Sequence, residues 1–262
     1  MHIRITAALA AGVLVLPFTA GIATAQAFTQ EQGHGRVITS LLWSQSDKGF
    51  DDRGHVFDIA DYQKTEVYFA AEYGVTDDLT LLVTPSLRDV SVQGGDDSRG
   101  LGYTDVGARF RLAHGSDFVL SAQGLVRFPG MKRRDSLAQV GVTDTEYDLR
   151  LQGGYTFGRG SFAIVEGGYR LRAGDPPNAI NIDATLGIRA APRLLLLASS
   201  YNAISDGAGR GVFRAYRYHN LYLSGAYDVG RHVTVQLGAS GTLAGRNALR
   251  ERGLLAGLWY RF

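Results

Sequence analysis

Residues Thr65 to Tyr73 read TEVYFAAEY, and this short stretch decides the fold. Apolar side chains stand at every second position from Val67 to Tyr73, and the alternate positions, from Glu66 to Glu72, carry an acid at each end. Consecutive side chains of a β-strand point to opposite faces, so one face of this stretch is apolar and the other carries charge. The stretch is predicted to be a strand that separates an apolar environment from a polar one.

The same alternation recurs along the whole chain. It is found from Leu79 to Leu87, from Thr104 to Leu112, from Tyr147 to Tyr155 and from Ile180 to Arg189. A period of two over such lengths indicates half-buried strands. Leu194 to Leu197 are four leucines in a row, and this run does not tell which of its faces is the apolar one.

Connections of two lengths alternate between these strands. Short turns rich in Gly, Pro and Asp are predicted at 76–78, 114–117, 157–160, 190–192 and 228–231, and longer polar loops at 48–60, 93–100, 129–143, 173–178, 205–213 and 244–250. Alternating short turns and long loops are typical of a transmembrane barrel. The predicted fold class is all-β: an antiparallel, up-and-down, transmembrane β-barrel of twelve strands.

A soluble β-sandwich is the alternative architecture, because alternation alone does not distinguish an apolar inside from an apolar outside. The apolar faces contain many small residues, including Ala71, Ala108, Ala122 and Ala184, and the polar faces contain many charges. Such apolar faces would pack a poor soluble core, and this favours the barrel.

Aromatic residues cluster near the predicted strand ends, where amphipathic rings favour the depth of lipid headgroups. One girdle is predicted near the short turns, from Tyr73, Phe110, Phe118, Tyr155, Phe157, Phe162 and Tyr227. The opposite girdle is predicted from Trp43, Tyr62, Phe128, Tyr147, Tyr169, Tyr201 and Tyr216.

The two ends of the chain indicate an exported protein. A basic start, an apolar run and the small-residue site Ala23-Thr24-Ala25 predict a cleaved signal peptide over residues 1–25, with a retained membrane helix as the alternative. Residues 26–262 would then form a single barrel domain in the cell outer membrane, reached through the periplasm. At the other end Leu258, Tyr260 and Phe262 alternate on one strand face, which resembles the signal that outer-membrane barrels present to the barrel-assembly machinery.

Composition excludes several classes of function. The chain has 27 basic and 25 acidic residues, so nucleic-acid binding has no electrostatic support. It has no cysteine, which excludes disulfides, thiolate catalysis and cysteine-bound metal. No cofactor or metal is expected. Its 34 glycines suit curved, closely spaced strands better than helices.

Two motifs resemble a known family. They are the hairpin Ala71-Glu72-Tyr73-Gly74-Val75-Thr76-Asp77-Asp78 with Leu79 to Leu81, and the segment Gly100-Leu101-Gly102 with Asp105 to Leu112. Together they resemble outer-membrane barrels associated with the meta-cleavage pathway of phenol degradation. In this chain Tyr103 and Thr104 separate Gly102 from the acid at Asp105, which departs from the family pattern. The resemblance implies a membrane barrel of transport type and does not identify an aromatic substrate.

If the apolar faces meet lipid, the polar faces line the lumen. The candidate lumen-lining residues are Glu66, Glu72, Asp105, Arg109, Arg111, Asp148, Arg150, Glu166, Arg170, Asp183 and Arg189, and the same faces carry Lys64, Arg127 and Arg261. Two interpretations stay open: a narrow polar conduit for the passive transport of small molecules, or a structural or adhesive barrel filled by mutually paired side chains.

A surface hydrolase is the third and weakest interpretation, and the chain is predicted not to be an enzyme. The most suggestive trio is His219, Asn220 and Ser224, but His219 and Asn220 are adjacent in a strand and cannot face one pocket. The expected partners are instead membrane lipid, the assembly machinery, a small solute and lipopolysaccharide, whose phosphates would meet the basic run Lys132 to Arg134.

Overall fold

The opening stretch alternates as expected in the computed structural model, which describes residues 27–95, 97–130 and 144–262. TEVYFAAEY lies within strand β2 (Val56–Thr76). Glu66 and Tyr68 are buried on one side of the strand, whereas 39% of Phe69 and 46% of Tyr73 are exposed on the other. The polar side chains therefore point to the inside of the molecule and the apolar ones to the outside.

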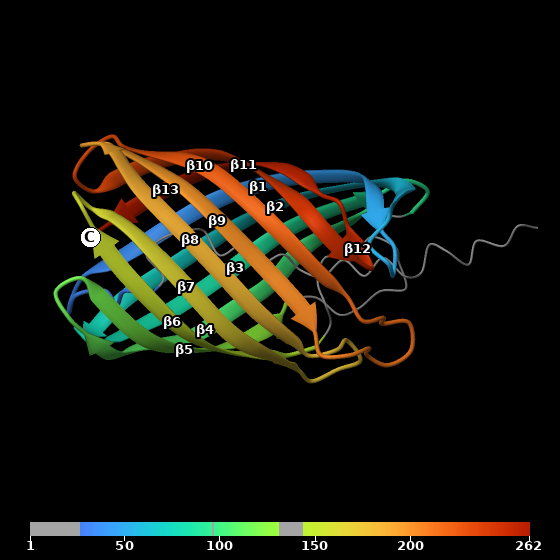
Figure 1. The fold of residues 1–262 in the computed structure, drawn as a ribbon, viewed down its shortest axis with the longest axis horizontal. Helices are drawn as coiled ribbons and strands as arrows, with labels where there is room; N and C mark the ends of the chain where they lie inside the picture. Colours follow the sequence, from blue (N-terminus) through green and yellow to red (C-terminus); the bar gives the residue numbers. More distant parts are fainter. Residues whose placement is uncertain (1–26, 96, 131–143) are drawn as a thin grey trace, which may run out of the picture.

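In the described part of the chain, twelve long strands form one closed antiparallel sheet (Figure 1). They are β1 (Gly35–Phe50), β2, β3 (Leu79–Val92), β4 (Ser98–His114), β5 (Phe118–Pro129), β6 (Glu146–Phe157), β7 (Ser161–Arg172), β8 (Ala179–Ala191), β9 (Leu194–Ser205), β10 (Arg217–Asp228), β11 (Val233–Arg246) and β13 (Arg252–Arg261). The strand β12 (Ala248–Leu249) has only two residues and pairs with the end of β1. Consecutive long strands pair, and β13 closes the barrel on β1. The predicted fold class is confirmed.

The two ends of the barrel differ in the length of their connections. At one end, which also holds the C-terminus in Figure 1, turns of two to four residues join the strands. At the other end the connections are mostly longer, but the predicted loop at 48–60 is wrong in its bounds, because only residues 51–55 separate β1 from β2. The two strands continue past a register shift between Ser46 and Lys48, and beyond it Lys48 lies opposite Asp58 and Phe50 opposite Val56.

Two predictions fall outside the described residues: the signal peptide at 1–25 and the basic run Lys132 to Arg134. The predicted strand at Leu194 to Leu197 can now be oriented. Leu195 and Leu197 are buried inside the barrel, and Leu196 is exposed on its outer face.

Large apolar side chains cover the outside of the barrel. Leu151, Val165 and Leu237 are each more than half exposed, on strands from different parts of the wall. Exposed apolar surface of this extent is typical of a barrel surrounded by lipid. Among the described residues, no helix has the length and apolar character needed to cross a membrane.

The aromatic girdles are only partly as predicted. Tyr73, Phe110, Phe118, Tyr155, Phe157 and Tyr227 are exposed near the short turns, as are Phe128 and Tyr147 near the long loops. Phe162, Tyr62, Tyr201 and Tyr216 are instead buried, so their assignment to the outer girdles was wrong. Proximity to a strand end does not determine on which side of the wall a ring lies.

We expect the outer face to tolerate a charge according to its depth. Phe69→Arg places a cation within the apolar band of β2, whereas Gln63→Arg places one on the same face of the same strand nearer the long loops. In lipid vesicles Phe69→Arg should lower the free energy of unfolding by about 2–4 kcal/mol and Gln63→Arg by about 0–1 kcal/mol. Urea titration of both variants measures this, and equal effects would contradict a lipid-facing exterior.

Candidate functional site in the barrel lumen

The inside of the barrel has two halves of different chemistry. The inward side chains of β2 to β8, here called the charged wall, include most of the buried acids and arginines. The inward side chains of β9, β10, β11, β13 and β1, here called the neutral wall, carry no charge away from the short-turn end. Both walls follow from alternation, because each strand contributes every second residue to the interior.

Ion pairs link neighbouring strands of the charged wall. Arg127 on β5 reaches Asp105 on β4 at 2.9 Å and Glu146 on β6 at 2.7 Å. Glu146 in turn accepts from Arg172 on β7 at 2.8 Å and lies 3.6 Å from Arg170. Each carboxylate therefore meets arginines from the strands beside it.

Arg150 on β6 connects three strands. Its guanidinium lies 2.6 Å from Asp148, 2.7 Å from Asp183 on β8 and 3.3 Å from Glu166 on β7. Gln152 donates to the same Glu166 at 3.1 Å. A guanidinium has five donors in a planar fork, which suits it to satisfy several acids at once.

The charged wall continues across β2 and onto the end of β1. Glu72 on β2 accepts from Arg36 at 2.6 Å and lies 3.4 Å from Arg109 on β4. On the same strand Glu66 pairs with Arg88 of β3. Lys64 lies 3.6 Å from Glu251, so the ion pairs extend from β2 to the residue just before β13.

The charges of these interior pairs are balanced. Eight acids and eight bases take part, all with side chains at most 14% exposed. The acids are Glu66, Glu72, Asp105, Glu146, Asp148, Glu166, Asp183 and Glu251, and the bases are Arg36, Lys64, Arg88, Arg109, Arg127, Arg150, Arg170 and Arg172. Buried ions are stable only when paired, and a balanced set leaves little net field to select an ion by its sign.

The segment Ala27 to Gln32 enters the barrel at the short-turn end and is here called the inner segment. Ala27 is fully buried, whereas Glu31 and Gln32 are exposed. The carbonyl of Ala27 accepts from Ser121 Oγ at 2.6 Å, and that of Phe28 accepts from Arg109 at 2.9 Å. Gln30 donates through its side chain to Glu72 at 2.8 Å. Ala27 is fully buried in an apolar cluster with side chains of both walls. The inner segment therefore occupies part of the lumen and is held by polar and apolar contacts.

The neutral wall is made of aromatic, aliphatic and small polar side chains. Trp259 donates its indole N–H to Gln236 at 3.1 Å, and Gln236 donates to Ser224 at 2.8 Å. Tyr201 and Tyr222 meet edge to face, with ring centroids 5.3 Å apart. This half of the lumen can contact apolar and hydrogen-bonding groups alike, and it holds no buried charge of its own away from the rim.

The eleven predicted lumen residues divide into two groups. Arg111 and Arg189 lie at the short-turn rim, where they pair with Asp78 at 2.7 Å and Asp228 at 2.9 Å. The other nine lie in the interior and belong to the ion pairs described above, namely Glu66, Glu72, Asp105, Arg109, Asp148, Arg150, Glu166, Arg170 and Asp183.

Sequence reasoning missed Arg36, Arg88, Glu146, Arg172 and Glu251, which all join the same pairs. Arg88 and Glu146 lie one residue beyond the expected alternating segments 79–87 and 147–155, so extending these segments by one position would have found them. The other three lie outside every expected segment. The inner segment had no such signal, because a run of six residues outside any strand shows no period.

The candidate hydrolase residues are not brought together. The imidazole of His219 faces outward and lies 2.8 Å from the side-chain oxygen of Asn202. Ser224 faces inward and accepts from Gln236. A nucleophile and base must lie within hydrogen-bond reach, so this trio forms no catalytic site.

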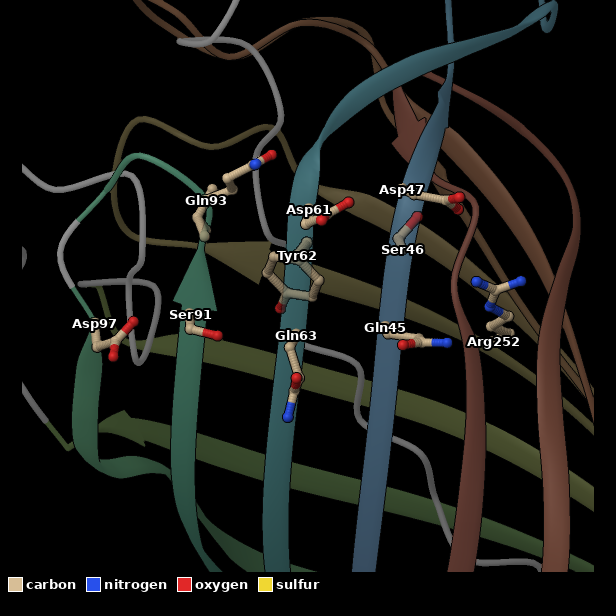
Figure 2. Close-up of a pocket in the computed structure, with 11 residues that line it drawn as sticks. Gln45, Ser46, Asp47, Asp61, Tyr62, Gln63, Ser91, Gln93, Asp97 and Arg252 are labelled. Atoms are coloured by element: carbon tan, nitrogen blue, oxygen red, sulfur yellow. The ribbon is translucent and has the colours of Figure 1, made fainter.

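A polar groove of about 590 Å³ crosses β13, β1, β2 and β3 toward the long-loop end (Figure 2). Its lining includes Gln45, Asp47, Gln63, Ser91 and Arg252. These residues alternate with the buried ones of the same strands, so the groove lies on the outer wall. The buried residues Ser46 and Tyr62 also line it.

No protein-family model matches the sequence, and no curated protein matches it either. Solved structures do match its fold. The COG4313 outer-membrane channel from Pseudomonas putida F1 is 16% identical, with a TM-score of 0.80, and the alignment covers 92% of this chain and 100% of that one. The translocator domain of the autotransporter NalP from Neisseria meningitidis is 12% identical, with a TM-score of 0.57 over 89% and 90% of the two chains.

The KdgM porin, solved in complex with disordered oligogalacturonate, is 10% identical, with a TM-score of 0.52 over 86% of this chain and 99% of that one. At these identities the likeness concerns the fold alone. The chain thus has the fold of outer-membrane barrels, among them channels and porins. The resemblance to barrels of the meta-cleavage pathway is not confirmed by these matches.

We expect Arg150 to be indispensable for the stability of the charged wall. Arg150→Met leaves Asp148, Glu166 and Asp183 facing one another without their shared cation. The free energy of unfolding in detergent should fall by about 3–5 kcal/mol, the usual cost of breaking a buried ion pair.

The matched control for this variant is Arg99→Met, because Arg99 is an exposed arginine that lies 3.8 Å from Asp89. That change should cost at most about 1 kcal/mol. Comparable losses in the two variants would show that the interior pairs contribute no more than surface ones.

Proposed function

We propose that this chain is a channel of the outer membrane for the passive passage of small solutes. The observation that carries the proposal is a closed barrel with an apolar outside and a polar, charge-balanced inside. Lipid would cover the outer face, and solute would pass between the charged and neutral walls. The fold of the COG4313 channel, shared over 92% of this chain, supports the same conclusion.

The proposal also covers the export and the assembly of the protein. Residues 1–25 would direct export and be removed, and residues 26–262 would fold in the outer membrane among lipid and lipopolysaccharide. The assembly machinery would bind the last strand through Leu258, Tyr260 and Phe262, which are exposed on one face, with the last two rings stacked 6.1 Å apart. The apolar cluster in the lumen supports a further proposal that hydrophobic or aromatic compounds are among the solutes.

One observation favours the alternative of a filled, non-conducting barrel. Ala27 of the inner segment belongs to an apolar cluster with Val119, Ile164 and Leu195, from both walls. A segment held this way narrows the lumen at its short-turn end. The two functions differ in a single measurable property, the passage of ions through the folded barrel.

Conductance of single molecules in planar lipid bilayers tests the proposal. The channel is expected to carry a small KCl current with a reversal potential near zero in a salt gradient, because its interior charges are balanced. A second sample lacks the inner segment. If neither correctly folded sample carries a current, the non-conducting barrel is the remaining interpretation.

A reversible cross-link tests whether the inner segment limits the current. The chain has no cysteine, and a Cβ added at Gly154 would lie 3.0 Å from the Cβ of Ala27. This is close to the spacing of about 3.5–4.5 Å in disulfides, so Ala27→Cys with Gly154→Cys should form one. Oxidation should lower the KCl current and a reductant should restore it, whereas Gly154→Cys alone should respond to neither. An unchanged current would mean that movement of this segment is not needed for passage.

A further inference from the structure

One buried polar side chain of the neutral wall, Asn220, has unused hydrogen-bonding groups. Asn220 on β10 is 1% exposed, and neither its amide nitrogen nor its amide oxygen has a hydrogen-bond partner among the residues that the structure describes. The buried hydroxyls of Ser40 and Ser44 on β1 also have no hydrogen-bond partner among the described residues. A buried polar group without a partner is costly, so such a group calls for a ligand or an ordered water.

The backbone directs Asn220 into the lumen. Asn220 lies between the inward residues Tyr218 and Tyr222 on β10. A register shift between β10 and β11 falls at His219 and Asn220. The extra residue at this shift is Leu243 on β11, and such bulges are common beside functional sites.

Aromatic rings surround this amide. Tyr201 is its partner across the sheet on β9 and meets Tyr222 edge to face at 5.3 Å. Above them, toward the long loops, Tyr216 and Tyr218 stack with their centroids 6.1 Å apart. A free amide between tyrosine rings offers one donor group, one acceptor and apolar faces on either side.

The charged side chains near Asn220 are paired with one another. Thr242 faces Asn220 on β11 and accepts from the backbone N–H of Glu251 at 3.2 Å. The carboxylate of Glu251 lies 3.6 Å from Lys64, so it is paired. The charges of the opposite wall pair with one another in the same way, and a charged solute would have to break these pairs or remain unpaired itself.

We propose that the neutral wall holds a binding site for uncharged solutes that carry hydroxyl or carbonyl groups on an apolar frame, centred on Asn220. The amide would take the polar groups of the solute, the tyrosine rings would contact its apolar face, and the paired charges opposite would disfavour ions. This site deepens the proposed channel function and rests on it.

Glucose and glucuronate are the probes for this site, because they share one ring and nearly one size but differ in charge. Both are titrated against the KCl current of the complete barrel in planar bilayers. Glucose should reduce the current at a concentration about tenfold lower than glucuronate, which corresponds to about 1.4 kcal/mol. Asn220→Leu should remove this difference. Asn220→Asp, which keeps the shape of the side chain but adds a negative charge, should weaken the effect of glucuronate further and so widen the difference.

The control is Asn202→Leu, an asparagine on the outer face of the neighbouring strand, and this variant should respond to glucose as the unchanged protein does. A KCl current in each variant shows that the barrel has folded. Equal effects of the two sugars on the unchanged protein, or an unaltered difference between them in Asn220→Leu, would overturn the site while the channel stands. Absence of KCl current in the unchanged protein would overturn the channel and the site together.

Discussion

The pairing of β13 with β1 closes the sheet, and the remaining structure depends on this closure. The two strands are in register from Arg36 opposite Arg261 to Gln45 opposite Arg252. A closed sheet has no edge with unpaired backbone groups, which is a condition for a β-structure inside lipid. Closure also gives every strand one inner and one outer face. Alternation in the sequence then becomes a separation of two environments around the whole molecule.

Charges inside a closed wall have to be satisfied by one another. Burying an ion costs several kcal/mol, and the cost is offset only by close, well-oriented partners. The charged wall meets this condition by sharing, because Arg150 serves three acids and Glu146 is approached by three arginines. Shared partners tie β4 to β8 together across the strands. The same sharing cancels the net charge that would otherwise select ions.

The sequence predicted this fold to a large extent because a period of two is a strong signal. It gave the barrel, the number of long strands and the positions of the turns, and it identified side chains such as Glu66 and Asp183 that lie inside. It did not give which face of Leu194 to Leu197 is inward, since four identical residues carry no alternation. Tyr201 was misassigned because distance from a strand end says nothing about the side of the wall on which a ring lies.

The contacts of the inner segment could not be predicted for another reason. They join residues far apart in the chain, such as Ala27 with Ser121 and Phe28 with Arg109, and no local pattern encodes them. Through those contacts the inner segment touches both the charged wall and the neutral wall. Arg109 and Glu72 hold the segment from the charged wall, while Ala27 packs in the apolar cluster that includes Leu195 and Trp259 of the neutral wall. In the proposed channel, an apolar solute bound in this cluster would therefore compete with Ala27 for the same apolar side chains. Binding of solute and seating of the inner segment draw on the same surface, so each would weaken the other, as linkage requires of two ligands that share a site.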